Sequence, residues 1–354
     1  MSDSVQASSS QPFSTEAYFQ SQQPPPTLAA KTAQVAAFVE KWQGVKGKRV
    51  VLITSGGTTV PLESNTVRFL DNFSAGTRGA TSAEYFLAAG YAVVFFHRLH
   101  SLRPFSRHYS HSLNPFLDLL TIKNGTEIGV KADDAAGLLP VLRAYNQAQE
   151  SGSLLSMDFQ TVNEYLWLLR AITREMAPLG RRGMFYLAAA VSDFFLPDER
   201  VAEHKIQSSV GMFSLEMDQV PKVLRPLVQE WIPEGYIVSF KLETDENLLI
   251  PKSRAALSRY GHQVVVGNDL HRRKQEVVFV ERSAKGTPAK GAGNSRLTGV
   301  QTPPVMDADL PEVEEYAETW LKLDQLQGSE GREVEIEELI VRELVLRHTK
   351  WTQE

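Results

Sequence analysis

One stretch, from Arg49 to Gly79, constrains the fold of this chain more strongly than any other. It starts with the apolar run Val50–Ile53, turns at the paired glycines Gly56 and Gly57, and crosses a long polar connection. It then reaches a Ser-x-Gly-x-x-Gly sequence just before a helical pattern. A strand, a glycine-rich turn and a helix N-terminus in this order are typical of the unit that opens a nucleotide-binding α/β fold.

Apolar runs and amphipathic patterns alternate along most of the chain. Continuous β-branched runs such as Val50–Ile53 are typical of strands that are buried on both faces of a parallel sheet. Strands are expected at residues 50–53, 91–96, 184–190, 213–217, 236–240, 262–266 and 277–280, and helices at residues 29–42, 80–89, 162–172, 221–231, 247–260 and 335–347. This alternation predicts an α/β fold with a doubly wound, mostly parallel, Rossmann-like sheet.

Three segments depart from that alternation. Residues 1–28 are rich in Ser, Gln and Pro, and such a composition buries too little apolar surface to offset the entropy of ordering, so they are expected to form a flexible tail. Residues 99–182 read as a helix-rich excursion that either covers the site or builds an oligomer interface. Residues 283–304 are rich in Gly, Pro, Ser and Lys and are expected to be a mobile loop. Residues 29–354 are otherwise expected to form one Rossmann-like domain.

Composition excludes several classes of protein. The net charge of −5 argues against non-specific nucleic-acid binding, which needs a basic surface. The absence of cysteine excludes a disulfide scaffold and a thiolate metal site, and favours the cytoplasm. No apolar run reaches the roughly 18 residues of a membrane span, and the N-terminus lacks the apolar core of a secretory signal. We therefore expect a cytoplasmic protein, with the nucleus as a second compartment, that binds neither nucleic acid nor membrane.

Polar residues and glycines follow several of the expected strands. In open α/β sheets, ligands bind beyond the carboxyl ends of the strands. Four such ends carry Thr54–Thr58, Val191–Asp193, Lys241 and Gly267–Asp269. Because parallel strands bring these ends to one edge of the sheet, they predict a single ligand site there.

The glycines and Ser74 point to an anion. Gly56 lets backbone N–H groups approach a polyanion, although a tight turn that needs positive φ would also explain it. Ser74, Gly76 and Gly79 at a helix start present free N–H groups to an anion, or else allow close packing of helix on strand. A compact G-x-G-x-x-G does not follow the first strand directly, which argues against a dinucleotide-binding turn.

Individual polar residues each have a functional and a structural interpretation. Arg68 suits bidentate binding of a phosphate or carboxylate, or a surface ion pair. The Asn72 side chain suits a hydrogen bond to a carbonyl oxygen on which negative charge develops, or the formation of an Asx-turn. Ala188–Ala190 before Asp193 leave room for a flat ligand, or mark a tightly packed central strand. Lys205 suits neutralisation of the charge of a triphosphate, or is an exposed surface lysine.

Four histidines raise the question of a metal site. They lie in an irregular segment with few carboxylates nearby, and no HExxH sequence is present. They are His97, His100, His108 and His111. No metal ligands are therefore assigned from the sequence.

Taken together, several long motifs are similar to those of the phosphopantothenate–cysteine ligases (phosphopantothenoylcysteine synthetases) of the free-standing eukaryotic type. The similarity covers most of residues 48–268 and the C-terminal helix. The motifs are TSGGTTVPLESNTVRFLDNFSAGTRG, AAAVSDFFLP, HKIQSS, VSFKLET and VVVGNDL. The resemblance implies that residues 29–354 form the ligase domain.

The resemblance also implies a reaction in coenzyme A biosynthesis. The carboxylate of 4′-phosphopantothenate would attack a nucleoside triphosphate, ATP or possibly CTP, with Mg²⁺, and pyrophosphate would leave. The amine of cysteine would then attack the acyl-nucleotide, which gives the amide and a nucleoside monophosphate. Such chemistry depends on positioning and charge stabilisation rather than on a side-chain nucleophile.

Residue roles follow from the matching motifs. The resemblance implies a nucleotide site at Gly56, Ser74, Gly76, Gly79, Phe240 and Asn268. It implies contacts with phosphopantothenate or the acyl-nucleotide at Asn72, Ala189, Ala190 and Asp193. Lys205 would serve formation of the acyl-nucleotide, and Asn72 would serve its conversion to amide. Arg68 would bind the phosphate of the substrate held by the neighbouring subunit, which implies a homodimer.

Two alternatives and one further partner stay open at this point. A nicotinamide-dependent Rossmann oxidoreductase would suit the same sheet, although the missing compact glycine motif counts against it. A non-catalytic scaffold subunit of a coenzyme A-synthesising complex would keep the fold without the activity. A phosphopantothenoylcysteine decarboxylase is a possible binding partner. The register of Lys252, Arg254 and Arg259 relative to nucleotide-binding lysines of bacterial relatives is open, and with it the choice of nucleotide.

Overall fold

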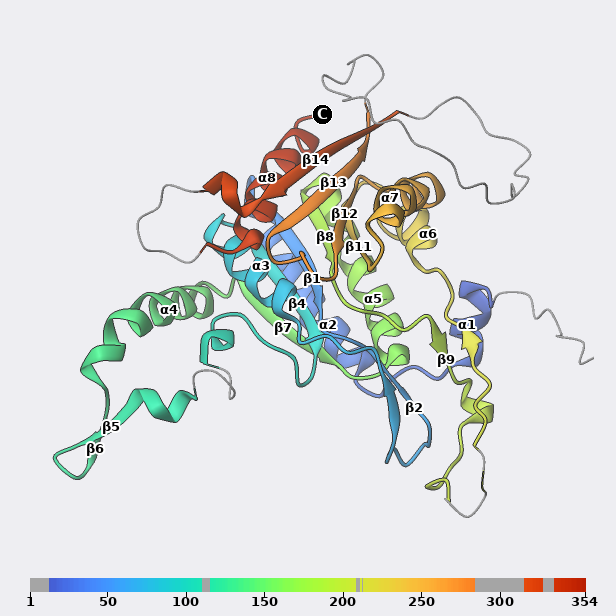
Figure 1. The fold of residues 1–354 in the computed structure, drawn as a ribbon, viewed down its shortest axis with the longest axis horizontal. Coiled ribbons are helices and arrows are strands. Elements are labelled where there is room, and N and C mark those ends of the chain that lie inside the picture. Colours follow the sequence, from blue (N-terminus) through green and yellow to red (C-terminus); the bar gives the residue numbers. More distant parts are fainter. Residues whose placement is uncertain (1–12, 110–114, 208–210, 212, 284–314, 327–333) are drawn as a thin grey trace, which may run out of the picture. The chain divides into compact units, whose positions relative to one another are not determined.

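The computed structural model describes residues 13–109, 115–207, 211, 213–283, 315–326 and 334–354 (Figure 1). Contacts group the chain into two compact units. The first comprises Met1–Ile237 with Glu337–Glu354, and the second comprises Val238–Ile336.

A parallel sheet forms the centre of the first unit. Its strands are β1 (Val50–Ser55), β4 (Ala92–Arg98), β7 (Leu154–Phe159) and β8 (Gly183–Leu187). They lie in the order β8-β1-β4-β7, and the β1–β4, β1–β8 and β4–β7 pairs are all parallel. The expected strands at residues 50–53, 91–96 and 184–190 are confirmed, whereas β7 was not predicted. Its side chains are only partly buried and alternate weakly, as is common at the edge of a sheet.

Helices cover both faces of that sheet. The helices α2 (Leu28–Gln43) and α5 (Val162–Met176) share one buried cluster with Val50 and Leu52 of β1. Helix α3 (Thr77–Ala88) covers the other face, where its Phe86 ring lies 5.7 Å from the ring of Tyr186 on β8. Since alternate residues of the central strands face opposite layers, this arrangement confirms the doubly wound α/β fold.

The last helix joins the first unit from the far end of the sequence. It is α8 (Ile336–Trp351), close to the predicted 335–347. The side chain of His348 in this helix is buried. Its Nδ1 lies 2.9 Å from the Tyr91 hydroxyl oxygen, and its Nε2 lies 2.8 Å from the Arg181 carbonyl oxygen. Because a carbonyl oxygen only accepts, Nε2 carries the proton and Nδ1 accepts from the tyrosine.

The second unit has a mixed sheet. Its strands β11 (Tyr236–Glu243), β12 (Val264–Asp269), β13 (Glu276–Arg282) and β14 (Tyr316–Lys322) lie in that order. The β11–β12 pair is parallel and is connected by α7 (Glu246–Tyr260), while β12–β13 and β13–β14 are antiparallel. The expected elements at 236–240, 247–260, 262–266 and 277–280 are confirmed. No strand was expected after residues 277–280, but β14 follows them.

The N-terminal segment differs from the flexible tail that its composition predicts. Residues 1–12 lie outside the described residues. Helix α1 (Thr15–Ser21) follows, and it buries Tyr18 and Phe19. The Tyr18 ring lies 4.9 Å from that of Phe195, and the Phe19 ring lies 4.8 Å from that of Trp167. Two aromatic side chains that each bury a large apolar area are enough to offset the ordering of a short helix, and an average over the composition does not detect them.

The excursion predicted at residues 99–182 contains more strand than expected. It is made of η1 (Ser106–Tyr109), η2 (Phe116–Leu119), β5 (Leu120–Lys123), β6 (Glu127–Val130), α4 (Ala132–Ser151), β7, α5 and η3 (Ala177–Arg182). The strands β5 and β6 form an antiparallel hairpin. Figure 1 shows this hairpin and α4 in green, extending from the sheet of the first unit. The loop expected at 283–304 lies almost wholly outside the described residues.

Short elements complete the described chain. They are β2 (Thr59–Pro61), β3 (Phe69–Asp71), β9 (Phe194–Phe195), η4 (Asp198–Arg200), β10 (Asp218–Gln219), α6 (Leu224–Pro226), a π-helical turn η6 (Leu227–Trp231) and η7 (Leu323–Leu326). The strand expected at 213–217 is wrong, because only the two residues of β10 pair with β9. Pro226 divides the expected 221–231 helix, since its ring and missing N–H prevent a regular turn.

Candidate active site

An uncapped helix start lies beside the carboxyl end of β1. Gly76 has φ +80° and precedes α3, and no side chain among the described residues caps the first turn of that helix. The Ser55 hydroxyl donates to the Gly76 carbonyl oxygen at 3.0 Å and ties the turn to the strand. Backbone N–H groups in the first turn of α3 therefore remain available to an anion.

The glycines of this region serve different purposes. Gly56 has φ +84°, so its turn needs the left-handed region that glycine adopts freely. At Gly79 a Cβ would lie 2.4 Å from the Ser55 hydroxyl oxygen, which shows close packing of α3 on β1. The two structural interpretations considered from the sequence, a positive-φ turn and close packing, thus hold at Gly56 and Gly79.

Asn72 lies against the same turn. The Asn72 N–H donates to the Thr58 carbonyl oxygen at 3.1 Å, and a Cβ on Gly57 would lie 1.6 Å from the Asn72 carbonyl oxygen. Only a glycine at residue 57 allows this approach. Asn72 is exposed, so its side chain is accessible to a ligand.

Ala189 and Ala190, which follow β8, lie against the same glycine turn. The Ala189 N–H donates to the Thr54 hydroxyl at 3.1 Å, and the Ala190 N–H donates to the Gly56 carbonyl oxygen at 2.8 Å. The Thr58 N–H in turn donates to the Ala190 carbonyl oxygen at 3.1 Å. The first unit therefore brings together the glycine turn, Asn72 and Ala189–Ala190; the strand-end argument predicts the approach of the two strand ends but not that of Asn72.

Asp193 has a partner that the sequence did not single out. Its carboxylate accepts from the Lys222 ammonium at 3.0 Å, and both side chains are exposed. A pair this exposed is worth little stability. Lys222 is therefore a cation beside a predicted substrate contact, and it lies in the stretch 221–231 that was expected to be helical.

Arg98 was also missed. Its guanidinium donates from Nη1 to both carboxylate oxygens of Asp71, at 2.7 and 2.9 Å. Asp71 immediately precedes Asn72, so this pair holds the end of β3. Arg98 is the last residue of β4, and the strand-end argument would have found it if it had been applied to this strand.

Arg68 and Lys205 lie on neighbouring segments. The Arg68 guanidinium donates to the Ile206 carbonyl oxygen at 2.9 Å, one residue after Lys205. Lys205 itself is exposed. The ion pair considered for Arg68 is present at 3.6 Å, and its partner Glu63 is buried rather than on the surface.

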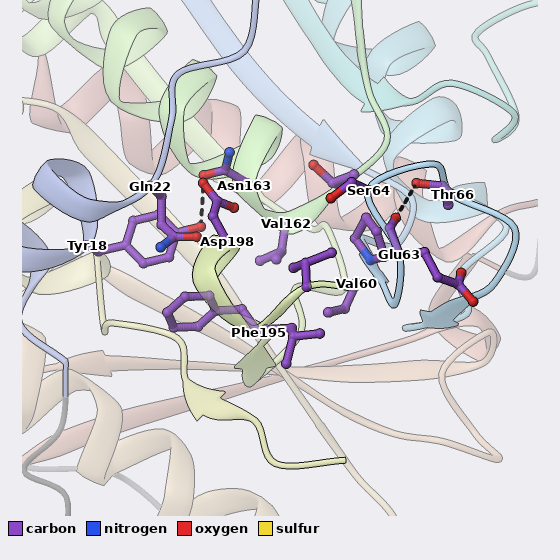
Figure 2. Close-up of a pocket in the computed structure, with 14 residues that line it drawn as sticks. Tyr18, Gln22, Val60, Glu63, Ser64, Thr66, Val162, Asn163, Phe195 and Asp198 are labelled. Carbon is purple, nitrogen blue, oxygen red and sulfur yellow. Dashed lines mark hydrogen bonds between the residues drawn. The ribbon is translucent and has the colours of Figure 1, made fainter. Parts of the chain in front are cut away.

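A cavity of about 220 Å³ lies in the first unit (Figure 2). It is lined by Tyr18, Gln22, Val60, Pro61, Glu63, Ser64, Thr66, Thr161, Val162, Asn163, Phe195, Leu196, Asp198 and Val201. None of the predicted site residues lines it. Two of its polar groups bond each other, since the Tyr18 hydroxyl donates to the side-chain amide oxygen Oδ1 of Asn163 at 3.1 Å. Burial, with a smaller effect of Asp198, raises the pKa of Tyr18, so its hydroxyl keeps its proton. The cavity is not the predicted nucleotide site.

The second unit contains the remaining predicted residues. Asn268 is buried in β12 and lines a cavity of about 520 Å³ with Arg272, Trp320 and Lys322 among others. Phe240 is partly buried on β11 and does not line that cavity.

Two of the three cations that the sequence left open are paired. Lys252 donates to Glu243 at 2.7 Å, and Arg254 pairs with Glu318. Burial opposes ionisation of Glu243, but the hydrogen bonds and charges of Lys252 and Lys241 lower its pKa below the ordinary value. The predicted strand-end residue Lys241 thus forms one ion-paired group with Glu243 and Lys252.

Two of the four histidines, His97 and His108, have structural partners, and His111 lies outside the described residues. His97 is buried, with Nδ1 2.7 Å from the Arg98 carbonyl oxygen and Nε2 3.1 Å from the Ser156 hydroxyl, and burial lowers its pKa to about 4. His108 pairs with Glu84 at 3.0 Å. Within the described ranges, no three or more His, Cys, Asp or Glu residues gather to hold a metal ion. Over the same ranges, no helix is both long and apolar enough to cross a membrane.

Comparison with known proteins gives one consistent family. The model of the DNA/pantothenate metabolism flavoprotein C-terminal domain matches residues 157–296. The chain is 40% identical to phosphopantothenate–cysteine ligase CAB2 of Saccharomyces cerevisiae, over 95% of this chain and 86% of that protein. It is 46% identical to the phosphopantothenate–cysteine ligase of Homo sapiens, over 74% of this chain and 85% of that one. A solved Cab2 mutant in complex with phosphopantothenate-cysteine superposes with a TM-score of 0.79 at 40% identity, over 96% of this chain and 98% of that chain.

Proposed function

This chain belongs to the phosphopantothenate–cysteine ligase family, and we propose that it joins 4′-phosphopantothenate to cysteine in coenzyme A biosynthesis. The observation that carries the proposal is the meeting of Asn72, the glycine turn and Ala189–Ala190 beside the uncapped start of α3. This arrangement supports chemistry in which an anionic phosphate and a reacting carbonyl group lie side by side.

The first step is activation of the carboxylate of 4′-phosphopantothenate. Its oxygen attacks the α-phosphorus of a nucleoside triphosphate, the bond to the β,γ-pyrophosphate breaks, and pyrophosphate leaves. Free N–H groups in the first turn of α3 favour the phosphate oxygens. Lys205 supplies a positive charge for the triphosphate as negative charge moves to the leaving group.

The second step is formation of the amide. The amine of cysteine attacks the acyl carbon, a proton is lost, and the nucleoside monophosphate leaves with the electrons of the broken C–O bond. Negative charge gathers on the carbonyl oxygen during this attack. The Asn72 side-chain amide donates a hydrogen bond to that oxygen, and its fixed backbone means that little reorganisation is needed.

The nucleotide and the metal are further parts of this proposal. We propose ATP as the co-substrate, with CTP as the alternative, and Phe240 and Asn268 as contacts for it. Mg²⁺ commonly keeps several waters and binds through substrate phosphates rather than through a protein cage. The donor set of the described residues fits that mode, because no group of carboxylates or histidines gathers as a cage. Mg²⁺ would neutralise phosphate charge, and no protein ligand is assigned to it.

The assembly is proposed on the resemblance. Arg68 binds the phosphate of 4′-phosphopantothenate held by a second copy of the chain, so the active form is a homodimer. A guanidinium has five N–H donors, and the two recorded interactions of Arg68 leave others for a phosphate. The cytoplasm, with the nucleus as a second compartment, and binding to a phosphopantothenoylcysteine decarboxylase are proposed in the same way.

One assay tests the function. The purified chain is incubated with Mg²⁺, ATP or CTP, 4′-phosphopantothenate and cysteine, and pyrophosphate is measured. We expect pyrophosphate and 4′-phosphopantothenoylcysteine in equal amounts, with full turnover only when both substrates are present. Absence of the amide under all combinations would refute the function, and NADH consumption would support the oxidoreductase instead.

A further inference from the structure

Glu63 is a carboxylate with no solvent-exposed surface in the loop that joins β2 to β3. Its Oε2 accepts from the Arg68 N–H at 3.0 Å and from the Val67 N–H at 3.4 Å. Its Oε1 accepts from the Ile206 N–H at 3.3 Å. One side chain therefore bonds two backbone segments that lie more than a hundred residues apart in the sequence.

The surroundings of Glu63 favour its charged form. Burial by itself would raise the pKa of this carboxyl group. The N–H groups of Arg68, Ile206 and Val67, with the Arg68 guanidinium, outweigh burial and hold the pKa below its ordinary value. Glu63 is thus an anion near neutral pH, and its hydrogen bonds are charge-assisted.

Further bonds join the same two segments. The Ser64 N–H donates to the Ala202 carbonyl oxygen at 2.8 Å, and both the backbone N–H and the side-chain amide of Asn65 donate to the Glu203 carbonyl oxygen, at 3.2 and 3.1 Å. Residues 63–65 and 202–206 therefore run side by side over the stretch that contains Lys205. In Figure 2, Glu63 and Ser64 lie together at the edge of the cavity.

We propose that Glu63 is a positioning residue for the first chemical step. Its buried carboxylate holds the Lys205 segment against the loop that carries Arg68, so that both cations are placed by one anion. Glu63 acts through these residues and does not itself contact substrate. The inference rests on the proposed function, because the step that the Glu63 contacts would affect is formation of the acyl-nucleotide.

Glu63→Gln tests this inference. The amide side chain keeps nearly the same shape, but it removes the charge and turns an NH₂ group toward backbone donors. We expect pyrophosphate release in the absence of cysteine to slow at least tenfold and the KM for 4′-phosphopantothenate to rise. The fraction of acyl-nucleotide that cysteine converts to amide should stay unchanged, which places the defect in the first step. A general loss of folded protein would lower the amount of product but leave the KM unchanged, so the rise in KM separates the two explanations.

The matched control is Glu203→Gln. It removes a carboxylate from the same segment, but the Glu203 side chain is 79% exposed and only the backbone carbonyl of this residue bonds the loop. Its activity should equal that of the unchanged chain. Backbone hydrogen exchange at residues 202–207 should accelerate in Glu63→Gln and not in Glu203→Gln.

A second variant keeps the test decisive if Glu63→Gln does not fold. Asn65→Ala removes one bond between the same segments from the exposed side and should slow the first step and accelerate exchange at 202–207 to a smaller degree. Unchanged exchange and unchanged pyrophosphate release in the folded variants would overturn the inference. If the unchanged chain forms no amide, the proposed function fails, whereas the exchange measurement still reports whether Glu63 holds the segment.

Discussion

The backbone of Asn72 is fixed by contacts with other parts of the chain. Its backbone bonds Thr58, its carbonyl oxygen fills the space that Gly57 leaves, and the residue before it is held by Arg98. The side chain nevertheless remains exposed. A fixed backbone with an open polar side chain suits a group that must meet a reacting atom without reorganising.

The first prediction concerns the amide step. Asn72→Ala should still release one equivalent of pyrophosphate, but amide formation should fall roughly 10²–10³-fold, as when a single oxyanion donor is removed. Single-turnover assays with and without cysteine separate the two steps. Asn146→Ala, an exposed asparagine on α4, is the matched control and should be unaffected. Normal amide formation in Asn72→Ala would refute its assigned role.

The second prediction concerns the activation step. Lys205→Gln should abolish the burst of acyl-nucleotide, because the positive charge beside the triphosphate is lost. The measurement is rapid-quench detection of acyl-nucleotide without cysteine. Lys46→Gln removes an equally exposed positive charge elsewhere and should leave the burst intact. A burst of normal size in Lys205→Gln would contradict the assignment.

At the scale of elements, the turn between β1 and β2 connects three segments. The Asn72 backbone packs against this turn on one side, Ala190 pairs with it on the other, and the segment just before α3 also lies close to it. Packing of this kind leaves no space for an added methyl group at Gly57, because the Asn72 backbone occupies that space.

The third prediction follows from that packing. Gly57→Ala should destabilise the fold by about 1–3 kcal/mol and nearly abolish amide formation, since the new Cβ must displace the Asn72 backbone. Urea denaturation and the amide assay measure the two effects. Gly137→Ala on α4, where a Cβ would meet nothing within 4 Å, should leave both unchanged or slightly raise stability. Full activity in Gly57→Ala would show that Asn72 needs no such constraint.

The fourth prediction concerns α8. Burial above all lowers the pKa of His348 to about 4, against about 6.5 in an unfolded chain. As the pH falls below about 6.5, the unfolded state binds a proton that the folded state does not, so stability should fall until about pH 4, by at most about 1.4 kcal/mol per pH unit. Urea denaturation of His348→Gln between pH 7.5 and 5 should show a weaker loss than the unchanged chain. An equally steep loss would mean that His348 is not responsible, and exposed His271→Gln serves as the control.

At the scale of the whole molecule, the predicted site residues divide between the two compact units. The glycine turn, Asn72, Arg68 and Lys205 belong to the first unit, while Phe240 and Asn268 belong to the second. The proposed role of Arg68 adds a second copy of the chain. Activity should therefore depend on assembly as well as on the residues of one copy.

The fifth prediction tests that dependence. Arg68→Ala and Asn72→Ala should each have low activity alone. When the two are unfolded together and refolded as a mixture, about a quarter of full activity should return, because half of the dimers are mixed and one of their two sites keeps both residues. Amide formation in the mixture measures this, and each variant refolded alone is the control. No recovery would place Arg68 in the site of its own subunit.

Local patterns accounted for most elements and for the centre of the site. The β1–α3–β4 unit follows from an apolar run, a glycine turn and a helical period, all of which are properties of neighbouring residues. The ends of the strands at 50–53 and 184–190 were predicted to meet because parallel strand ends share an edge, whereas a shared place for Asn72 and Ala189–Ala190 came from the resemblance. The missed features depend on distant partners: α1 on Trp167 and Phe195, and β14 on pairing with β13.

The sequence by itself determined the type of most elements, the doubly wound α/β class and the motifs that identify the ligase family. Only the tertiary structure decided that Glu63 bonds the Lys205 segment, that Arg98 clamps Asp71, and that the Asn72 backbone fills the space at Gly57. The physical reason is that propensity and periodicity act over a few residues, whereas a hydrogen bond between distant residues exists only after folding has closed the chain between them.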